Sequence, residues 1–176
     1  HAGAGLTTVI CPRAAMPVLQ QEVPNATCLA AEDQPTPKCD ALLMGCGIAE
    51  NDDTYADMMR LKATDAYQVW DAGALNLLAG HPQQLGARAV ITPHAGEAAR
   101  LLGWEIPAVL SDKLGAAEAL RAKYGCNVVL KSAVTVMLTA DGQQCALNAV
   151  GSPALAKGGS GDALAGILAS LLGQGL

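Results

Sequence analysis

Short runs of apolar residues alternate along this chain with longer stretches in which apolar and polar positions are mixed. Five of these runs have the length of strands, at residues 6–11, 41–44, 68–70, 87–91 and 127–130. Apolar runs of this length are typical of parallel strands that are covered on both faces, because neither side of such a strand meets water. The pattern therefore predicts five buried parallel strands.

Helical spacing is clearest between the predicted strands at 87–91 and 127–130. Residues 111–124 have Ser111 in the position of an N-cap and Gly125 just past the end, where a left-handed residue often terminates a helix. Four side chains of this stretch recur on one stripe: Leu114, Ala117, Leu120 and Tyr124. We expect a helix here that packs this stripe against the sheet.

The alternation of strands and helices ends after the fifth predicted strand, at 127–130. Residues 134–137 and 144–148 are strand-like and flank an Ala-Asp-Gly turn signal at 140–142, so they predict an antiparallel hairpin. A loop rich in small residues, 151–161, follows the hairpin. It leads into a last helical stretch with an apolar stripe at Leu164, Ile167, Leu168, Leu171 and Leu172.

Strands that alternate with helices indicate an α/β fold. We expect three layers, with helices on both faces of a mostly parallel, doubly wound sheet and the antiparallel hairpin near residues 133–148. No repeat or low-complexity linker divides the sequence, so residues 1–176 read as one domain. With 51% hydrophobic residues and no Phe, its core is expected to be aliphatic.

Charge and cysteine usage narrow the classes of partner. A formal net charge of -5 argues against general binding to nucleic acid or anionic membranes, because both usually recruit basic surfaces. The six cysteines form no metal-ligand spacing, which favours reduced thiols in the cytoplasm. No apolar stretch is long enough to span a bilayer and no signal peptide opens the chain, so we expect a soluble cytoplasmic protein.

The strongest local signal for chemistry is the sequence Gly-Gly-Ser-Gly-Asp. Its residues Gly158, Gly159, Ser160, Gly161 and Asp162 stand directly at the start of the last helix. A helix N-terminus offers free N–H donors to an anion, and Asp162 can accept the proton of a hydroxyl that attacks a phosphoryl group. The alternative is a flexible turn with Asp162 as a helix cap.

A second group of polar residues follows the strand at 87–91. The sequence Thr-Pro-His-Ala-Gly-Glu at 92–97 places His94 at a strand's carboxyl end, where open α/β sheets bind their ligands. His94 and Glu97 can therefore reach the same pocket as Asp162, although His94 can also be a structural helix cap or a loop histidine.

Other strand ends carry weaker signals. Gly47 lies in a Gly-Cys-Gly turn after 41–44, and Asp71 directly follows 68–70; both segments can be ordinary turns. Lys131 ends the strand at 127–130, where it can meet a nucleotide phosphate or be a solvated strand-end charge.

Taken together, these segments resemble the NAD(P)H-hydrate dehydratases of the ribokinase-like superfamily. The resemblance covers almost the whole chain and rests on the segments at 45–49, 71–75, 92–97, 130–135, 151–156 and 158–162. It implies a ribokinase-like fold and an enzyme that uses ADP or ATP, with Mg²⁺ bridging the phosphates, to phosphorylate the 6-hydroxyl of hydrated NADH or NADPH. Phosphate then leaves and NADH or NADPH is restored, which is metabolite repair.

The resemblance also assigns roles to individual residues. Gly47, His94 and Asp162 would contact the hydrate, with Asp162 as the base and residues 158–161 as the anion hole. The adenine nucleotide would contact Lys131, Ser132, Ala133, Val134, Thr135 and Gly161. No protein residue is expected to be a dedicated metal ligand. The resemblance further implies a homotetramer, and an NAD(P)H-hydrate epimerase as a fused or separate partner.

The sequence departs from the family at several positions. Ser132 and Ala49 replace glycines, Ala95 replaces Pro and Ser152 replaces Asn. Ser132 is the one expected to alter nucleotide fit, because a side chain stands where the backbone should approach the ligand. An earlier strand with a Gly-rich segment and later helices of the family have no counterpart here, so we expect a fragment that lacks part of the hydrate site.

Two other functions fit parts of the pattern. A vitamin or sugar kinase of the same superfamily would use the same glycine-rich loop and Asp162, but segment 92–97 favours the dehydratase. A nucleotide-binding domain without catalysis would fit the missing segments and Ser132, but the intact Asp162 argues against it.

Overall fold

Two β-sheets and seven α-helices make up the part of the chain that the computed structural model describes, residues 2–36 and 38–176. The strands are β1 (Thr7–Cys11), β2 (Ala26–Ala30), β3 (Ala41–Met44), β4 (Tyr67–Trp70), β5 (Ala89–Ile91), β6 (Asn127–Leu130), β7 (Thr135–Leu138) and β8 (Cys145–Asn148). The α-helices are α1 (Met16–Glu22), α2 (Asp52–Lys62), α3 (Gly73–Gly80), α4 (Ala95–Leu102), α5 (Ile106–Ser111), α6 (Lys113–Tyr124) and α7 (Ser160–Gly173). Short 3-10 helices lie at Arg13–Ala15, Ala31–Asp33 and Pro153–Leu155.

The larger sheet has six strands in the order β3-β4-β5-β6-β7-β8. The first four strands are parallel, with Met44 opposite Trp70 and Trp70 opposite Ile91. Strands β7 and β8 are antiparallel to their neighbours and form the predicted hairpin. The mostly parallel sheet with an antiparallel hairpin is confirmed.

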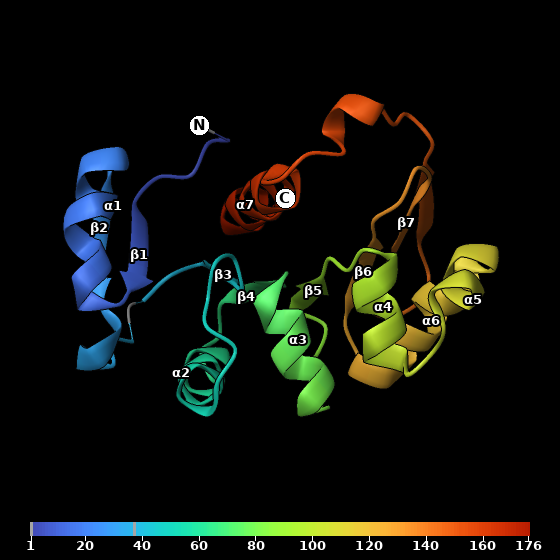
Figure 1. Cartoon of the computed structure of the whole chain (residues 1–176), viewed down its shortest axis with the longest axis horizontal. Coiled ribbons are helices and arrows are strands. Elements are labelled where there is room, and N and C mark those ends of the chain that lie inside the picture. The colour runs from blue at the N-terminus through green and yellow to red at the C-terminus, as the bar shows by residue number, and fades with distance from the viewer. Residues whose placement is uncertain (1, 37) are drawn as a thin grey trace.

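The helices lie on both sides of this sheet. In Figure 1, α2, α3 and α4 lie along one face, and α7 lies across the other, where it packs against β3 and β4. The two faces of β4 are therefore both covered, and Val69 and Trp70 are fully buried. This is the layering that the apolar runs predict.

The first predicted strand forms as β1, but its surroundings differ from the prediction. It pairs with β2 in a separate two-stranded parallel sheet rather than in the large sheet. Leu6 is fully exposed and Thr7 and Thr8 are exposed, so the strand is not buried at its start. Strand β2, with the sequence Ala-Thr-Cys-Leu-Ala, was not predicted.

The core is mostly aliphatic, as expected, but two aromatic side chains lie at its centre. Trp70 and Tyr124 are the largest fully buried side chains. Each has a partner for its polar atom: Trp70 Nε1 donates to Gln68 at 3.2 Å, and the Tyr124 hydroxyl donates to the Leu101 carbonyl at 3.1 Å. Buried aromatic rings with satisfied polar ends compensate for the absence of Phe.

The helix predicted at 111–124 is two helices. Ser111 is the last residue of α5, and α6 begins at Lys113 with Asp112 as its cap, where the Asp112 carboxylate accepts from Gly115 N at 2.9 Å. The side-chain oxygen of an N-cap residue accepts from the third amide of the helix, and Asp112 makes this hydrogen bond in place of the predicted cap, Ser111. Of the predicted stripe, Ala117, Leu120 and Tyr124 are buried, but Leu114 is 46% exposed. Gly125 ends the helix with φ 63°, as predicted.

Helix α7 confirms the predicted position of the last helix but not the burial of its whole stripe. Ala165 is buried, whereas Ile167 is 47% exposed and Leu164, Leu168, Leu171 and Leu172 are only partly buried. This exposure follows from the helix covering only β3 and β4 of the sheet. Within the described ranges, no helix is long and apolar enough to cross a membrane.

Candidate functional site

The carboxyl ends of four parallel strands meet at one edge of the large sheet and are joined by backbone hydrogen bonds. Asp71 N donates to Met44 O at 3.1 Å, and Thr92 N donates to Trp70 O at 3.1 Å. Lys131 N then donates to Pro93 O at 2.8 Å. Residues far apart in the sequence are thus held in a fixed row at the edge where open α/β sheets bind ligands.

Gly45 makes the close approach of the first two strand ends possible. It has φ 121°, and a Cβ built on it would lie 1.7 Å from Asp71 O. A side chain cannot fit there, so glycine is required by both conformation and space. Ala72, on the other side of this contact, has φ 47° although it is not a glycine, which is a strained conformation of the kind found near functional sites.

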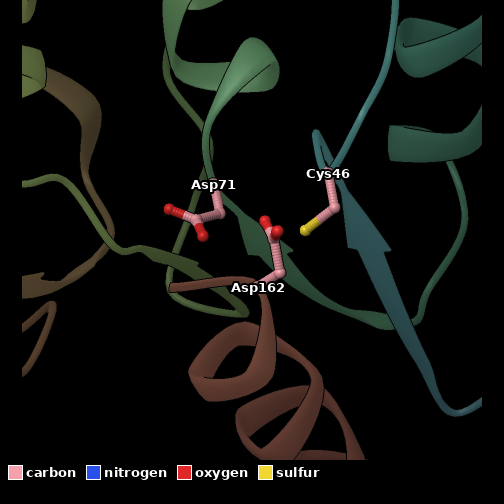
Figure 2. A group of neighbouring side chains, drawn as sticks. All are labelled: Cys46, Asp71 and Asp162. Atoms are coloured by element: carbon pink, nitrogen blue, oxygen red, sulfur yellow. The ribbon is translucent and has the colours of Figure 1, made fainter. Parts of the chain in front are cut away.

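Three polar side chains converge beside this contact (Figure 2). One ligand atom each from Cys46, Asp71 and Asp162 lies within 4.8 Å of the other two. Asp162 extends from the start of α7, and its carboxylate lies between the other two side chains in Figure 2. The helix and the strand ends therefore place the predicted base next to a thiol and a second carboxylate.

Asp71 is buried and forms a salt bridge with Lys131, which directly follows β6. Lys131 Nζ donates to Asp71 Oδ1 at 2.8 Å, and the side chains are 20% and 2% exposed respectively. Gly161 lies against the same pair, because a Cβ on it would be 3.3 Å from Lys131 Nζ and 3.6 Å from Asp71 Oδ2. Lys131 is therefore not the solvated strand-end charge that was the alternative; it brings a cation to the N-terminus of α7.

The N-terminus of α7 has the features of an anion site. Gly159 precedes the helix with φ 84°, and no side chain within the described residues caps the helix. The first amide of this 14-residue helix, Ser160 N, donates to Lys157 O at 3.3 Å, so the amides available to an acceptor are the next ones, at Gly161 and Asp162. The helix dipole adds to their attraction for an anion. The Lys131 ammonium nearby adds a full positive charge.

His94 is a helix cap that also lies at the site edge. Its Nδ1 accepts from Gly96 N at 3.0 Å and from Glu97 N at 3.2 Å, while Glu97 Oε2 accepts from His94 N at 2.7 Å. The structural alternative from the sequence is therefore correct. Because His94 forms a parallel bridge with Lys131, its exposed ring still lies along the same edge, although it is outside the cluster of Cys46, Asp71 and Asp162.

The segment expected to contact a nucleotide forms the turn between β6 and β7. Ser132 donates through its hydroxyl to Val134 O, and Thr135 donates to Ser132 O at 3.3 Å. The Ser132 hydroxyl is thus used inside the turn. Ala133 lies next to the loop that leads to α7, because a Cβ on Gly151 would be 3.1 Å from Ala133 O.

Gly47 and the glycine-rich loop are exposed near this edge. Gly47 has φ 68° in the turn that follows β3, and Gly158 and Gly159 are exposed before α7. Ser160 and Gly161 are half-buried in the first turn of the helix. The structure therefore places the predicted residues along one edge and brings the start of α7, at Gly161, beside Lys131 and Asp71.

Cys46 was not assigned to the site from the sequence, whereas Asp71 was noted as the end of a strand and Glu97 as part of the segment that contains His94. Cys46 and Asp71 stand in segments that read as ordinary turns, and only their positions directly after two neighbouring strands signalled a shared location. Glu97 is a buried acid, 7% exposed, three residues after His94. That spacing is the pattern of a capping box, and it could have identified the pair.

The Cys46 thiol is held in its protonated form. Burial raises the pKa of Cys46 to about 12, assisted by a hydrogen bond from the thiol to Asp162 and by the negative charges of Asp162 and Asp71; Lys131 opposes the shift. Only the thiolate is a strong nucleophile, so this cysteine is expected to be unreactive at neutral pH.

Alkylation of Cys46 is expected to accelerate in Asp162→Asn. Removing the charge of Asp162 lowers the pKa of the thiol, so the thiolate fraction at pH 8 rises and iodoacetamide reacts several-fold faster. Mass spectrometry of each cysteine against time measures the rate, with exposed Cys145 as the internal reference. An equal rate at Cys46 in both proteins would show that Asp162 does not act on the thiol.

Comparisons with known proteins give a consistent result. The family model described as NAD(P)H-hydrate dehydratase matches residues 1–176. A bifunctional NAD(P)H-hydrate repair enzyme of Vibrio cholerae is 44% identical over 136 residues, which are 77% of this chain and 27% of that protein. This chain thus spans about a quarter of the length of that curated relative.

Solved structures share the fold. A ribokinase-like superfamily protein of Enterococcus faecalis has a TM-score of 0.83 and 29% identity, covering 98% of this chain and 63% of that one. An ADP/ATP-dependent NAD(P)H-hydrate dehydratase of Bacillus subtilis, crystallised with ATP/Mg²⁺ and soaked with CoA, has a TM-score of 0.85 and 26% identity, covering 98% and 65%. The expected ribokinase-like architecture is confirmed.

Proposed function

The chain belongs to the NAD(P)H-hydrate dehydratase family, and from this premise we propose that it uses ADP or ATP to dehydrate hydrated NADH or NADPH back to NADH or NADPH. The observation that carries the proposal is the convergence of Asp162, the open N-terminus of α7 and the Lys131 ammonium at one strand edge. A hydroxyl to be phosphorylated needs a base, and the phosphoryl group needs donors and positive charge. The base, the N–H donors and the positive charge therefore lie within one small region of the structure.

In the proposed reaction Asp162 accepts the proton of the substrate's 6-hydroxyl. The hydroxyl oxygen forms a bond to the terminal phosphorus of the nucleotide, and the bond from that phosphorus to the nucleotide's bridging oxygen breaks. The amides that begin α7, around Gly161, and the ammonium of Lys131 stabilise the negative charge on the transferring group. The bond from the ring carbon to the phosphate oxygen then breaks, and phosphate leaves with that electron pair. The neighbouring ring carbon releases a proton to water, and the electrons of its C–H bond restore the double bond of the nicotinamide.

The nucleotide is assigned to the turn formed by Lys131, Ser132, Ala133, Val134 and Thr135, together with Gly161. This turn leads from β6 into β7 and lies beside the loop before α7. Gly47 and His94 are assigned to the hydrate, on the strand ends that flank the cluster. The relative of Bacillus subtilis, whose structure contains ATP/Mg²⁺, supports a nucleotide at this fold.

Magnesium fits the site through oxygen ligands. The carboxylates of Asp71 and Asp162 lie close together and are the hard donors that Mg²⁺ prefers, whereas the Cys46 sulfur is a soft donor that it does not. Bound chiefly through the nucleotide phosphates, Mg²⁺ would neutralise their charge.

Assembly and partners are part of the proposal. We propose a homotetramer, and an epimerase as a fused or separate partner, since the Vibrio cholerae relative is bifunctional. A cytoplasmic location accords with cysteines that are free throughout the described chain.

The test is recovery of NADH absorbance from NADH hydrate with Mg²⁺ and either ADP or ATP. The Bacillus subtilis enzyme serves as a positive control for the substrate. Recovery that requires a nucleotide supports the proposal. If no NADH forms while the control is active, and the chain phosphorylates a vitamin or sugar alcohol, the kinase function takes its place. Nucleotide binding without turnover of any substrate would indicate a non-catalytic domain.

A further inference from the structure

The hydrogen bonds around His94 determine where its ring carries a proton. Two backbone N–H groups, of Gly96 and Glu97, point at Nδ1 from 3.0 and 3.2 Å. Both are donors, so Nδ1 must present its lone pair and cannot carry a hydrogen. A histidine with one bare ring nitrogen is neutral, and its single ring proton is on Nε2.

The surroundings fix the orientation of the ring as well. Glu97 is buried and accepts from His94 N through Oε2, while its Oε1 lies 3.5 Å from Nε2. The ring also rests over Gly96, where an added Cβ would be 3.0 Å from His94 Cε1. The contact of 3.5 Å is long for a charge-assisted hydrogen bond, so Nε2–H is left to donate to a ligand atom that comes closer. The side chain is 59% exposed, which leaves that atom accessible.

We propose that Glu97 is a positioning residue that orients His94, whose ring the backbone amides of Gly96 and Glu97 keep neutral, so that Nε2–H is directed at a ligand oxygen that carries no proton. This inference rests on the proposed function and gives the two side chains different roles. Asp162 accepts a proton, whereas His94 only donates a hydrogen bond. His94 is therefore not a second base. The acceptor is a carbonyl or phosphate oxygen, either the carboxamide oxygen of the hydrated nicotinamide ring or a phosphate oxygen of the nucleotide.

The protonation state can be read directly by nitrogen NMR. The sequence has three histidines, so labelling histidine with ¹⁵N gives a simple spectrum, and His94→Asn identifies the signals of His94. We expect a protonated Nε2 and a bare Nδ1 at neutral pH, and the same pattern in Glu97→Gln, because the two backbone donors to Nδ1 remain. A ring that is doubly protonated, or protonated on Nδ1, would overturn the proposal whether or not the chain has enzymatic activity.

Kinetics of matched variants test the donor and identify its acceptor. His94→Asn keeps an oxygen that can cap α4 but cannot reach as far as Nε2, whereas His94→Gln places an amide donor farther out. We expect His94→Asn to fold and to raise one KM about tenfold, the loss of one good hydrogen bond, and His94→Gln to recover part of it. A rise in the KM for the hydrate identifies the carboxamide, and a rise in that for the nucleotide identifies a phosphate.

Non-additivity separates positioning from a merely structural role. Glu97→Gln should raise the same KM as His94→Asn, and the double variant should be no worse than His94→Asn alone, because Glu97 acts through His94. Glu118→Gln, an exposed glutamate on α6, is the control and should change neither KM. Additive effects, or a Glu97→Gln variant with both KM values unchanged, would refute the role of Glu97. If the unchanged chain forms no NADH, the proposed function fails, while the NMR result still decides the state of His94.

Discussion

Asp162→Asn is expected to lower nucleotide-dependent recovery of NADH by about 100- to 10,000-fold, the range for loss of a general base. Asparagine has nearly the shape of aspartate but cannot accept the hydroxyl proton. Since Asp162 is exposed at the start of α7 and asparagine can still accept the hydrogen bond from the Cys46 thiol, the variant should fold normally. The loss should appear in kcat, because the base acts in the transition state.

Two controls distinguish this effect from general damage. Asp53→Asn removes an exposed acid from the first turn of α2, outside the cluster of Cys46, Asp71 and Asp162, and should leave NADH recovery unchanged. Calorimetric titration of Asp162→Asn with nucleotide should give a Kd close to that of the parent chain, since the amides and Lys131 remain. If Asp162→Asn keeps more than a tenth of the kcat, the proton goes to another group and the assignment of the base is wrong.

The strands could be predicted because each is a short apolar run whose burial requires that pattern. Four of the five predicted strands form in the large sheet, and Ala41–Met44 and Asn127–Leu130 have the predicted bounds. The failures occur where local signals compete. Both Ser111 and Asp112 can cap a helix, and the sequence alone does not show that the chain ends one helix at the first and starts another from the second.

The candidate site was predictable only in part, for a related reason. Asp162 stands out because it directly follows a glycine-rich loop, and Lys131 stands out because it directly follows a strand. Asp71 and Cys46 do not, because their importance depends on contacts between segments that are distant in the sequence, such as the salt bridge from Lys131 to Asp71. His94 had two possible roles in the sequence, and the structure shows that it caps α4 with Nδ1, which leaves Nε2 for another partner.

Lys131→Met is expected to destabilise the fold by about 3–5 kcal/mol, the cost of leaving a buried charge without its partner. Asp71 has a side chain that is only 2% exposed, and Lys131 Nζ at 2.8 Å is the cation that compensates its charge. Methionine fills much of the same volume but gives no charge, so the free energy of unfolding, measured by urea titration, should fall by this amount. Lys38→Met, at an exposed lysine, should change it little.

A second substitution tests whether the uncompensated charge is the cause. Asp71→Asn combined with Lys131→Met removes both charges, and this pair should recover most of the lost free energy of unfolding, because a neutral amide is far less costly to bury than a carboxylate. If the double variant is as unstable as Lys131→Met, the loss comes from packing. The recovered stability should not restore activity, because Lys131 also supplies the positive charge beside the N-terminus of α7; a stable double variant with a weakened nucleotide Kd would separate these two roles of one side chain.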